Sequence, residues 1–386
     1  MIKELDFEQL FYRYKEGAIG HRYITNSHIE PLLKKLDSNF VIDIIGHSVN
    51  GIPIYSIKIG SGVKKILMWS QMHGNESTTT KALSDLFNSL SDTRLSDILK
   101  YCTLFIIPIL NPDGALAYTR LNANNIDLNR DAQRLTQPES IVLRKVFNDF
   151  QPSFCFNLHG QRTIFSAGNT NKPAIISFLA PAQDMECMVT EDRMIAMEVI
   201  VFMNNMLQEY IPNQVGRYDD AFNINCVGDT FQSENVPTIL FEAGHYINDY
   251  NREITRKYLY MSLLNALTTI ASKDNLRGNY SSYVDIPENH KLFSDIIIRN
   301  AKIVESQKER ILDIAFQYDE VLVDSKIKFL PKIKAFGDLS KFYGHKTIDA
   351  NKQLVKLASG NPLKVDCEID FVLIDNKLFS LKPVNN

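Results

Sequence analysis

The sequence comprises 386 residues, of which 45% are hydrophobic and 23% are charged, and its formal net charge is −3. This composition indicates a globular protein, and the length suffices for one large domain and a smaller one. The small net charge gives no electrostatic reason to expect nucleic acid or an anionic membrane as a partner. No apolar run reaches the roughly 18 residues that would span a bilayer.

The patterning along the chain predicts alternating helices and strands. Apolar residues at helical spacing predict helix over residues 1–37. A strand pair is expected around residues 40–45 and 52–59, because the intervening Asn50-Gly51 favours a tight turn. Further helices, which would cover both faces of a sheet, are expected at residues 78–90, 140–150, 191–210 and 252–271.

Several apolar runs stop abruptly at a polar residue that could carry chemistry. The runs and the residues that follow them are 66–69 before His73 and Glu76, 103–110 before Asn111, 154–158 before His159, and 238–241 before Glu242. Short apolar runs of this kind indicate strands buried on both faces, as in an α/β fold with a mixed, mostly parallel sheet. Ligands gather at the carboxyl ends of such strands, so these side chains could converge.

The pair His73 and Glu76 has the spacing of a zinc site. Two ligands three residues apart lie on one face of a single turn. Alone the pair is a weak signal, and its context in the chain carries the argument.

That context resembles the family of zinc carboxypeptidases. In order and spacing, the resemblance rests on His73-x-x-Glu76, Asn111-Pro112-Asp113-Gly114, Arg120, Asp127-Leu128-Asn129-Arg130, His159 and Glu242. It covers roughly residues 40–272, and the C-terminal remainder lies outside it.

The resemblance implies a role for each matching residue. His73, Glu76 and His159 would hold one Zn²⁺ per chain, and Glu242 would be the general base. Arg120 would stabilise the oxyanion, and Asn129 with Arg130 would grip the carboxylate of the substrate. Arg162, three residues beyond His159, is assigned to substrate binding, with a supporting role behind the metal ligand as the alternative.

One departure from the digestive carboxypeptidases concerns a tyrosine on a mobile loop. Those enzymes carry it roughly twenty residues before the catalytic glutamate, whereas no tyrosine lies between Asp219 and Glu242 here. The role is therefore either missing or passed to Tyr218 or Tyr246.

A polar stretch at residues 272–282 suggests a domain boundary. We expect a catalytic domain over residues 1–275 and a small β-rich domain over 276–386, because short β-branched runs follow the boundary. This second domain is expected to lie near the mouth of the active site and to limit substrate size.

The resemblance implies a metallocarboxypeptidase that cleaves an amide or peptide bond beside a free carboxylate. An amidase or deacylase of small N-acyl amino acids or cell-wall peptides, as in the succinylglutamate desuccinylase and aspartoacylase branch, is the alternative. A binding module without turnover is a third reading, against which the intact Glu242 argues. The sequence leaves the oligomeric state open.

Five cysteines without a CxxC pair argue against a disulfide framework. Charged residues throughout the first twenty positions also argue against the apolar core of a signal peptide in the chain as written. We therefore expect a cytoplasmic protein.

Overall fold

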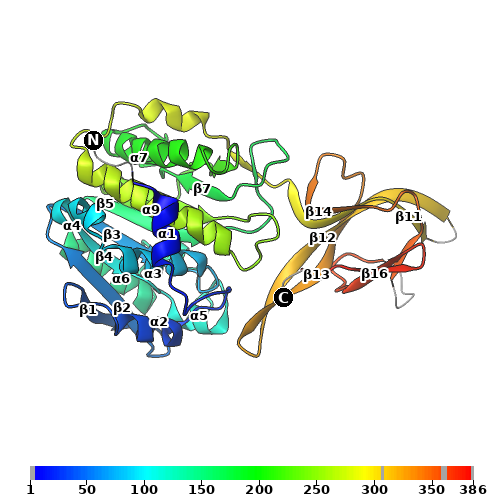
Figure 1. The fold of residues 1–386 in the computed structure, drawn as a ribbon, viewed down its shortest axis with the longest axis horizontal. Coiled ribbons are helices and arrows are strands. Elements are labelled where there is room, and N and C mark those ends of the chain that lie inside the picture. The colour runs from blue at the N-terminus through cyan, green and yellow to red at the C-terminus, as the bar shows by residue number, and fades with distance from the viewer. Residues whose placement is uncertain (1–4, 306–307, 358–362, 384–386) are drawn as a thin grey trace.

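The computed structural model describes residues 5–305, 308–357 and 363–383. Figure 1 shows an α/β body, which holds the N-terminal helices, beside a β-rich part built from the C-terminal strands. The predicted fold class is confirmed, because a mixed sheet is flanked by helices and further β-sheets follow it.

The central sheet of the α/β body has eight strands in the order β1-β2-β4-β3-β5-β9-β7-β8. Strands β4, β3, β5 and β9 pair in parallel, whereas β1, β2 and β7 supply antiparallel pairings toward the two edges. The strands are β1 (Val41–His47), β2 (Pro53–Gly60), β3 (Lys64–Ser70), β4 (Cys102–Ile107), β5 (Phe154–Gly160), β7 (Ile176–Leu179), β8 (Val215–Arg217) and β9 (Thr238–Ala243).

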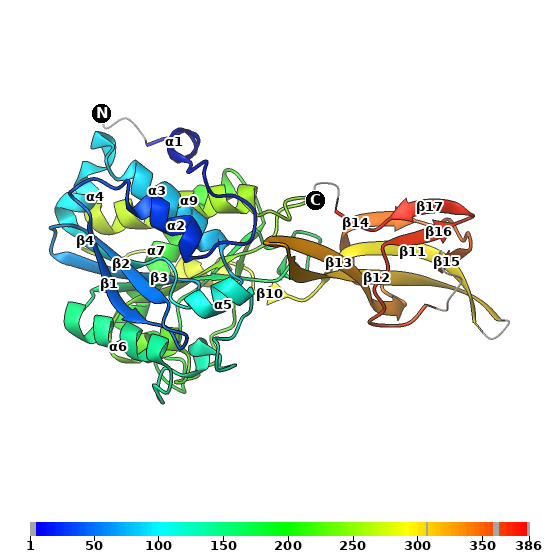
Figure 2. The same cartoon turned by 90° about the horizontal axis from the view of Figure 1, so that it is seen from below.

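Helices cover both faces of this sheet, as Figure 2 shows for α3, α4 and α9 on one side and α6 on the other. One face carries α1 (Phe7–Tyr14), α2 (Asn26–Leu33), α3 (Thr78–Ser89), α4 (Ser96–Tyr101), α7 (Glu191–Gln208) and α9 (Glu253–Ser272). A second hydrophobic cluster lies under α6 (Pro138–Phe150) and α8 (Val227–Ser233), and the short α5 (Pro112–Ala117) follows β4. None of the described helices is both long enough and apolar enough to cross a membrane.

The expectation of helix over residues 1–37 is wrong in its middle part, and residues 1–4 lie outside the described residues. Helix α1 ends at Tyr14 and α2 begins at Asn26, with extended chain and turns between them. Tertiary hydrogen bonds replace helical ones there, because the buried Arg256 donates to the carbonyls of Glu16 and Ile19. Apolar spacing alone could not reveal this competing set of partners.

The β-rich part has its own hydrophobic core, which begins at Ile296. One sheet has the order β13-β12-β11-β14 and a smaller one the order β15-β16-β17. The strands are β11 (Phe293–Glu305), β12 (Lys308–Val323), β13 (Lys326–Gly337), β14 (Tyr343–Asp349), β15 (Val355–Leu357), β16 (Phe371–Ile374) and β17 (Lys377–Ser380).

The segment between α9 and β11 packs on the α/β body. Leu276, Tyr283 and Ile286 belong to the hydrophobic cluster of the larger part. Strand β10 (Asn289–His290) then pairs with β6 (Ser166–Ala167). The described chain past residue 276 thus first contributes to the α/β core and only later to the β-sheets.

The β12–β13 hairpin reaches back to the α/β body. Glu320, near the end of β12, accepts hydrogen bonds from the guanidinium of Arg22 at 2.8 Å and from the hydroxyl of Tyr118. Arg22 precedes α2 and Tyr118 ends α5, so the contact joins segments that are far apart in the sequence. The β12–β13 hairpin of the C-terminal part therefore packs against the α/β body at Arg22 and Tyr118.

Removing one partner of the buried Asp85–Arg256 ion pair should strongly destabilise the α/β body. Both side chains are fully buried and lie 2.6 Å apart. We expect Asp85→Ala to lower the free energy of unfolding by about 3–5 kcal/mol, because the buried Arg256 loses its only fully buried carboxylate among the described residues and keeps only the partly exposed Glu253 at 3.1 Å. Urea unfolding measures this.

The exposed pair Lys145–Asp149 supplies the control, since its side chains are 71% and 64% exposed. Asp149→Ala should change the free energy of unfolding by less than about 1 kcal/mol. Similar losses in both variants would contradict a special contribution of the buried pair.

Candidate metal centre and cleft

The predicted metal ligands lie at the carboxyl ends of neighbouring parallel strands. His73 and Glu76 follow β3, whereas His159 lies near the end of β5, the strand paired with β3. Glu242 lies in β9 directly opposite His159 in the parallel register. The geometry of the sheet therefore brings these four residues to one edge.

The loop that carries His73 and Glu76 is held in place by the segment around Asn111. The side-chain amide of Asn111 donates to the carbonyl of Met72, and its side-chain oxygen accepts from the backbone of Gly114 at 2.8 Å. Gly74 packs so closely that a Cβ there would lie 1.9 Å from the carbonyl carbon of Gly114. The Asn-Pro-Asp-Gly motif thus supports the metal-ligand loop.

The side chains of His73, Glu76 and His159 aim their ligand atoms at one point. Nδ1 of His73 and Nδ1 of His159 are 3.1 Å apart, and each lies 2.9 Å from an oxygen of Glu76. Tetrahedral zinc with ligand bonds of about 2.1 Å would separate its ligand atoms by roughly 3.4 Å. The three residues therefore form a group that could hold a metal ion, and its atoms all lie within 4.8 Å of one another.

Further hydrogen bonds fix the orientation of these ligands. Nε2 of His73 lies 3.0 Å from Asp127, and the backbone N–H of Gly160 donates to Glu76 at 2.9 Å. A carboxylate behind a histidine ligand commonly fixes the ring and raises its basicity. Sequence reasoning placed Asp127 in a motif but gave it no role, and only the folded structure shows its contact with His73.

The pKa shifts of His73 and Glu76 show that the carboxylate of Glu76 is held in its anionic form beside the histidines. Burial alone would lower the pKa of His73, but Glu76 and Asp127 outweigh burial and raise it to about 9. Burial likewise raises the pKa of Glu76, and the two histidines outweigh it and hold that pKa well below its usual range. An anionic carboxylate facing two imidazoles is a donor set that a zinc ion can use.

One carboxylate oxygen of Glu242 is not engaged by any other described residue. Its Oε2 is buried and has no hydrogen-bond partner among the described residues. Burial, reinforced by the charge of Glu76, raises the pKa of Glu242 well above its usual value. A carboxyl group in such surroundings is typical of an acid–base catalyst.

Of the two tyrosines considered from the sequence, Tyr218 lies in the electrostatic field of the site. Burial raises its pKa, and the charges of Glu242 and Glu76 add to the shift. Tyr246 instead packs against the hydrophobic core of the α/β body.

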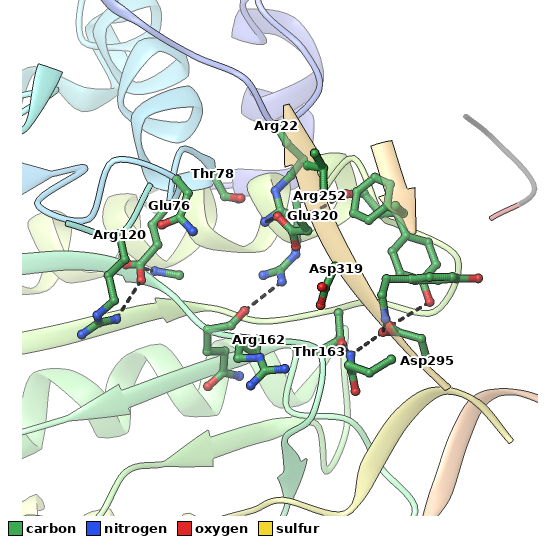
Figure 3. A pocket seen from close by; sticks show the side chains of 18 residues that line it. Arg22, Glu76, Thr78, Arg120, Arg162, Thr163, Arg252, Asp295, Asp319 and Glu320 are labelled. Carbon is green, nitrogen blue, oxygen red and sulfur yellow. Dashed lines mark hydrogen bonds and ion pairs between the residues drawn. The ribbon is translucent and has the colours of Figure 1, made fainter. Parts of the chain in front are cut away.

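Arg120 lies beside the predicted metal ligands. Its guanidinium donates twice to Asp127, at 3.1 and 3.0 Å, and approaches Glu76 at 3.6 Å. Figure 3 shows this side chain next to Glu76 at one end of a pocket. The side chain is 46% exposed and can therefore be reached by a ligand.

Asn129 and Arg130 lie in the short helical turn Leu128–Arg130. The side-chain oxygen of Asn129 accepts from the backbone of Val227 at the start of α8, and the exposed Arg130 donates to the carbonyl of Asn129. These contacts tie the pair to α8, and neither residue lines the pocket shown in Figure 3.

Arg162 lies in a cavity of about 410 Å³ between the α/β body and the β12–β13 hairpin. Glu76 and Arg120 also line this cavity, so it opens onto the predicted metal ligands. The sequence gave no reason to place Arg22, Arg252, Asp319 or Glu320 here, because no motif contains them and their proximity depends on the tertiary fold.

Comparison with known proteins agrees with this geometry. Residues 27–172 match the model of the zinc carboxypeptidase family. Carboxypeptidase SOL1 of Arabidopsis thaliana is 31% identical over 163 residues, which cover 36% of this chain and 33% of that relative. The resemblance predicted from the sequence is therefore confirmed over this part of the chain.

Solved structures are similar in fold. A putative carboxypeptidase A from Shewanella denitrificans superposes with a TM-score of 0.54 at 16% identity, covering 64% of this chain and 69% of that one. A metallo-carboxypeptidase from Pseudomonas aeruginosa, in complex with (2-guanidinoethylmercapto)succinic acid, gives a TM-score of 0.51 at 16% identity, with 64% and 69% covered. The chain covers between a fifth and a third of the length of its curated relatives. The family implies zinc as the metal.

Replacing His159 by alanine should abolish stoichiometric zinc binding. One of three protein ligands is lost, so the affinity should fall by more than the about 10- to 100-fold that is usual for outer-shell changes. Metal analysis after equilibrium dialysis measures this, and His47→Ala, which removes an exposed histidine of β1, is the control. Full zinc affinity in His159→Ala would show that the ion binds elsewhere.

Proposed function

We propose that this protein is a zinc-dependent hydrolase that cleaves an amide or peptide bond beside a free carboxylate, that is, a metallocarboxypeptidase. The observation that carries the proposal is the convergence of His73, Glu76 and His159 beside Glu242. The match of residues 27–172 to the zinc carboxypeptidases supports it.

The proposed site binds one Zn²⁺ per chain through His73, Glu76 and His159. When bound, zinc supplies Lewis-acid chemistry, polarising the scissile carbonyl and making water more acidic. Glu242 accepts the proton of the attacking water at its unpartnered Oε2 and passes it to the leaving nitrogen. Arg120, at the mouth of the site, stabilises the negative charge that develops on the carbonyl oxygen.

Recognition of the terminal carboxylate falls to Arg130 and Asn129 in this proposal. The planar guanidinium group of an arginine can donate two parallel hydrogen bonds to a carboxylate. Arg130 is exposed, and its backbone is held by the turn that Asp127 caps through the N–H of Asn129. This arrangement leaves the guanidinium accessible to substrate.

A deacylase or amidase of small N-acyl amino acids or cell-wall peptides is the second candidate. The cavity of about 410 Å³ favours it, because the β12–β13 hairpin walls off the space beside the metal ligands. A long peptide needs an open groove, whereas a short acyl group needs only a pocket. We propose that the hairpin limits the length of the substrate on this side.

The cytoplasm remains the proposed location. All five cysteines are free, and Cys102 and Cys155 are buried. Reduced, buried thiols of this kind are usual in a reducing compartment.

The experiment that tests the proposed function uses three substrate classes with the zinc-loaded enzyme. Release of the C-terminal amino acid is measured from dipeptides, from peptides of ten residues and from N-acyl amino acids. Preference for long peptides would contradict the limit on length, whereas hydrolysis confined to N-acyl amino acids would favour the deacylase. A lack of turnover on all three would support a binding module.

Glu242→Gln should reduce kcat by at least about 100-fold while zinc content and fold remain intact. The amide has the shape of the carboxylate but cannot accept the proton. Steady-state kinetics, metal analysis and circular dichroism measure the three properties. Loss of zinc in this variant would make Glu242 a metal ligand, and wild-type kcat would remove it from the reaction.

Arg130→Ala should lower kcat/KM about 10- to 100-fold for substrates with a free carboxylate, because a charge-assisted interaction is lost. The same substrates with the carboxylate amidated should be affected far less. Arg134→Ala, which removes an exposed arginine four residues along, is the matched control. Equal losses on both kinds of substrate would assign Arg130 a structural role.

A further inference from the structure

The cavity beside the metal ligands is walled by two parts of the chain. Figure 3 shows Glu76, Arg120 and Arg162 on the side of the α/β body, with Asp319 and Glu320 of the β12–β13 hairpin across from them. The lining is rich in charged side chains, so their pairing determines which charge a ligand must bring.

The carboxylates that the hairpin presents to the cavity are already engaged. Glu320 accepts hydrogen bonds from Arg22 and from Tyr118. Asp319 forms an ion pair with Lys332 of β13 at 2.5 Å. Neither carboxylate therefore needs a cation from a ligand.

A third acidic group, Asp295 of β11, is hydrogen-bonded within the protein. It accepts from the hydroxyl of Tyr250 at 3.0 Å, from the backbone of Tyr318 at 2.7 Å and from the side-chain amide of Gln317. Burial raises its pKa to about 6 despite these hydrogen bonds, and the three donors already engage both of its carboxylate oxygens.

Two arginines of the lining have no carboxylate partner among the described residues. Arg252 is 2% exposed, and its guanidinium donates only to the backbone carbonyls of Ala243 and Gln161, leaving Nε buried without a partner. Arg162 forms no hydrogen bond or ion pair through its side chain within the part of the chain that the structure describes, and it lies exposed in the cavity.

The two unpaired arginines lie on the same wall. Arg252 hydrogen-bonds at 2.8 Å to the carbonyl of Gln161, the residue before Arg162. Burial, together with the neighbouring charge of Arg22, lowers the pKa of Arg252 to about 10, and the charges of Glu320 and Asp249, which form no ion pair with it, offset this only in part. A bound anion would relieve this electrostatic cost.

The position of the cavity defines which part of a substrate would enter it. Glu76 and Arg120 lie at its edge, whereas Asn129 and Arg130 do not line it. If Arg130 holds the terminal carboxylate, the scissile bond lies at the metal ligands and the acyl side of the substrate extends into the cavity.

We propose that this cavity is a second anion site, in which Arg162, supported by Arg252, binds a carboxylate on the acyl side of the scissile bond. The inference rests on the proposed hydrolase function and narrows its substrate class. The preferred substrates are short and carry two carboxylates, one on each side of the cleaved amide.

The test compares two acyl groups that differ only in charge. Glutaryl and glutaramoyl amides of the same amino acids end in a carboxylate and in a primary amide, respectively. A panel of acidic, basic, aromatic and aliphatic amino acids covers the unknown preference of the other side. We expect kcat/KM of the zinc-loaded enzyme to be at least about tenfold higher for the glutaryl substrate.

Arg162→Gln should bring the ratio of the two kcat/KM values close to one, and Arg162→Lys should retain part of the preference because it keeps the charge. Arg13→Gln, which removes an exposed arginine of α1, is the control and should leave the ratio unchanged. Circular dichroism confirms that the variants are folded.

The outcomes separate this inference from the proposed function. Hydrolysis of both acyl groups with equal kcat/KM would overturn the second anion site and leave the hydrolase intact. A preference that persists in Arg162→Gln would overturn the assignment to Arg162. Failure to hydrolyse either series, with zinc bound, would overturn the proposed function and this inference with it.

Discussion

The parallel pairing of β4, β3, β5 and β9 is the constraint on which the candidate site depends. Parallel strands end at the same edge of a sheet, so residues from separate parts of the chain meet without any long loop. His73 and Glu76 follow one strand, and His159 and Glu242 lie in register on the next two. Backbone hydrogen bonds of the sheet fix the places of His159 and Glu242, and the contacts of Asn111 and Gly74 hold the loop of His73 and Glu76 beside them.

How much the sequence could predict follows from the range of the interactions involved. The apolar runs and the His-x-x-Glu pair are local patterns, and they predicted the strands, the fold class and the residues that converge. The ion pair of Arg22 with Glu320 joins residues 298 positions apart, so no pattern in neighbouring residues could predict it. For the same reason the wall of the cavity and the role of Arg252 became visible only in the folded chain, while the break between α1 and α2 follows from tertiary contacts of Arg256.

The contact between Arg22, Tyr118 and Glu320 explains how two separate cores are held in one relative position. Apolar contacts alone tolerate sliding, whereas buried charged groups must meet their partners or remain unsatisfied. Arg22 is 7% exposed, so separating it from Glu320 without exposure to water would be costly. The ion pair therefore favours one position of the β12–β13 hairpin against the α/β body. That position sets the shape of the cavity beside the metal ligands.

The hairpin belongs to a part of the molecule with its own hydrophobic core, distinct from the core beneath the metal ligands. Substitutions in β12 and β13 can consequently reshape the pocket while the catalytic framework keeps its packing and its stability. The residues that shape the pocket on the hairpin side thus pack on one hydrophobic core, and the metal ligands with Glu242 lie on a part of the chain with another. Such a division lets the range of accepted substrates drift through changes in the C-terminal sheet, with little penalty to the reaction itself.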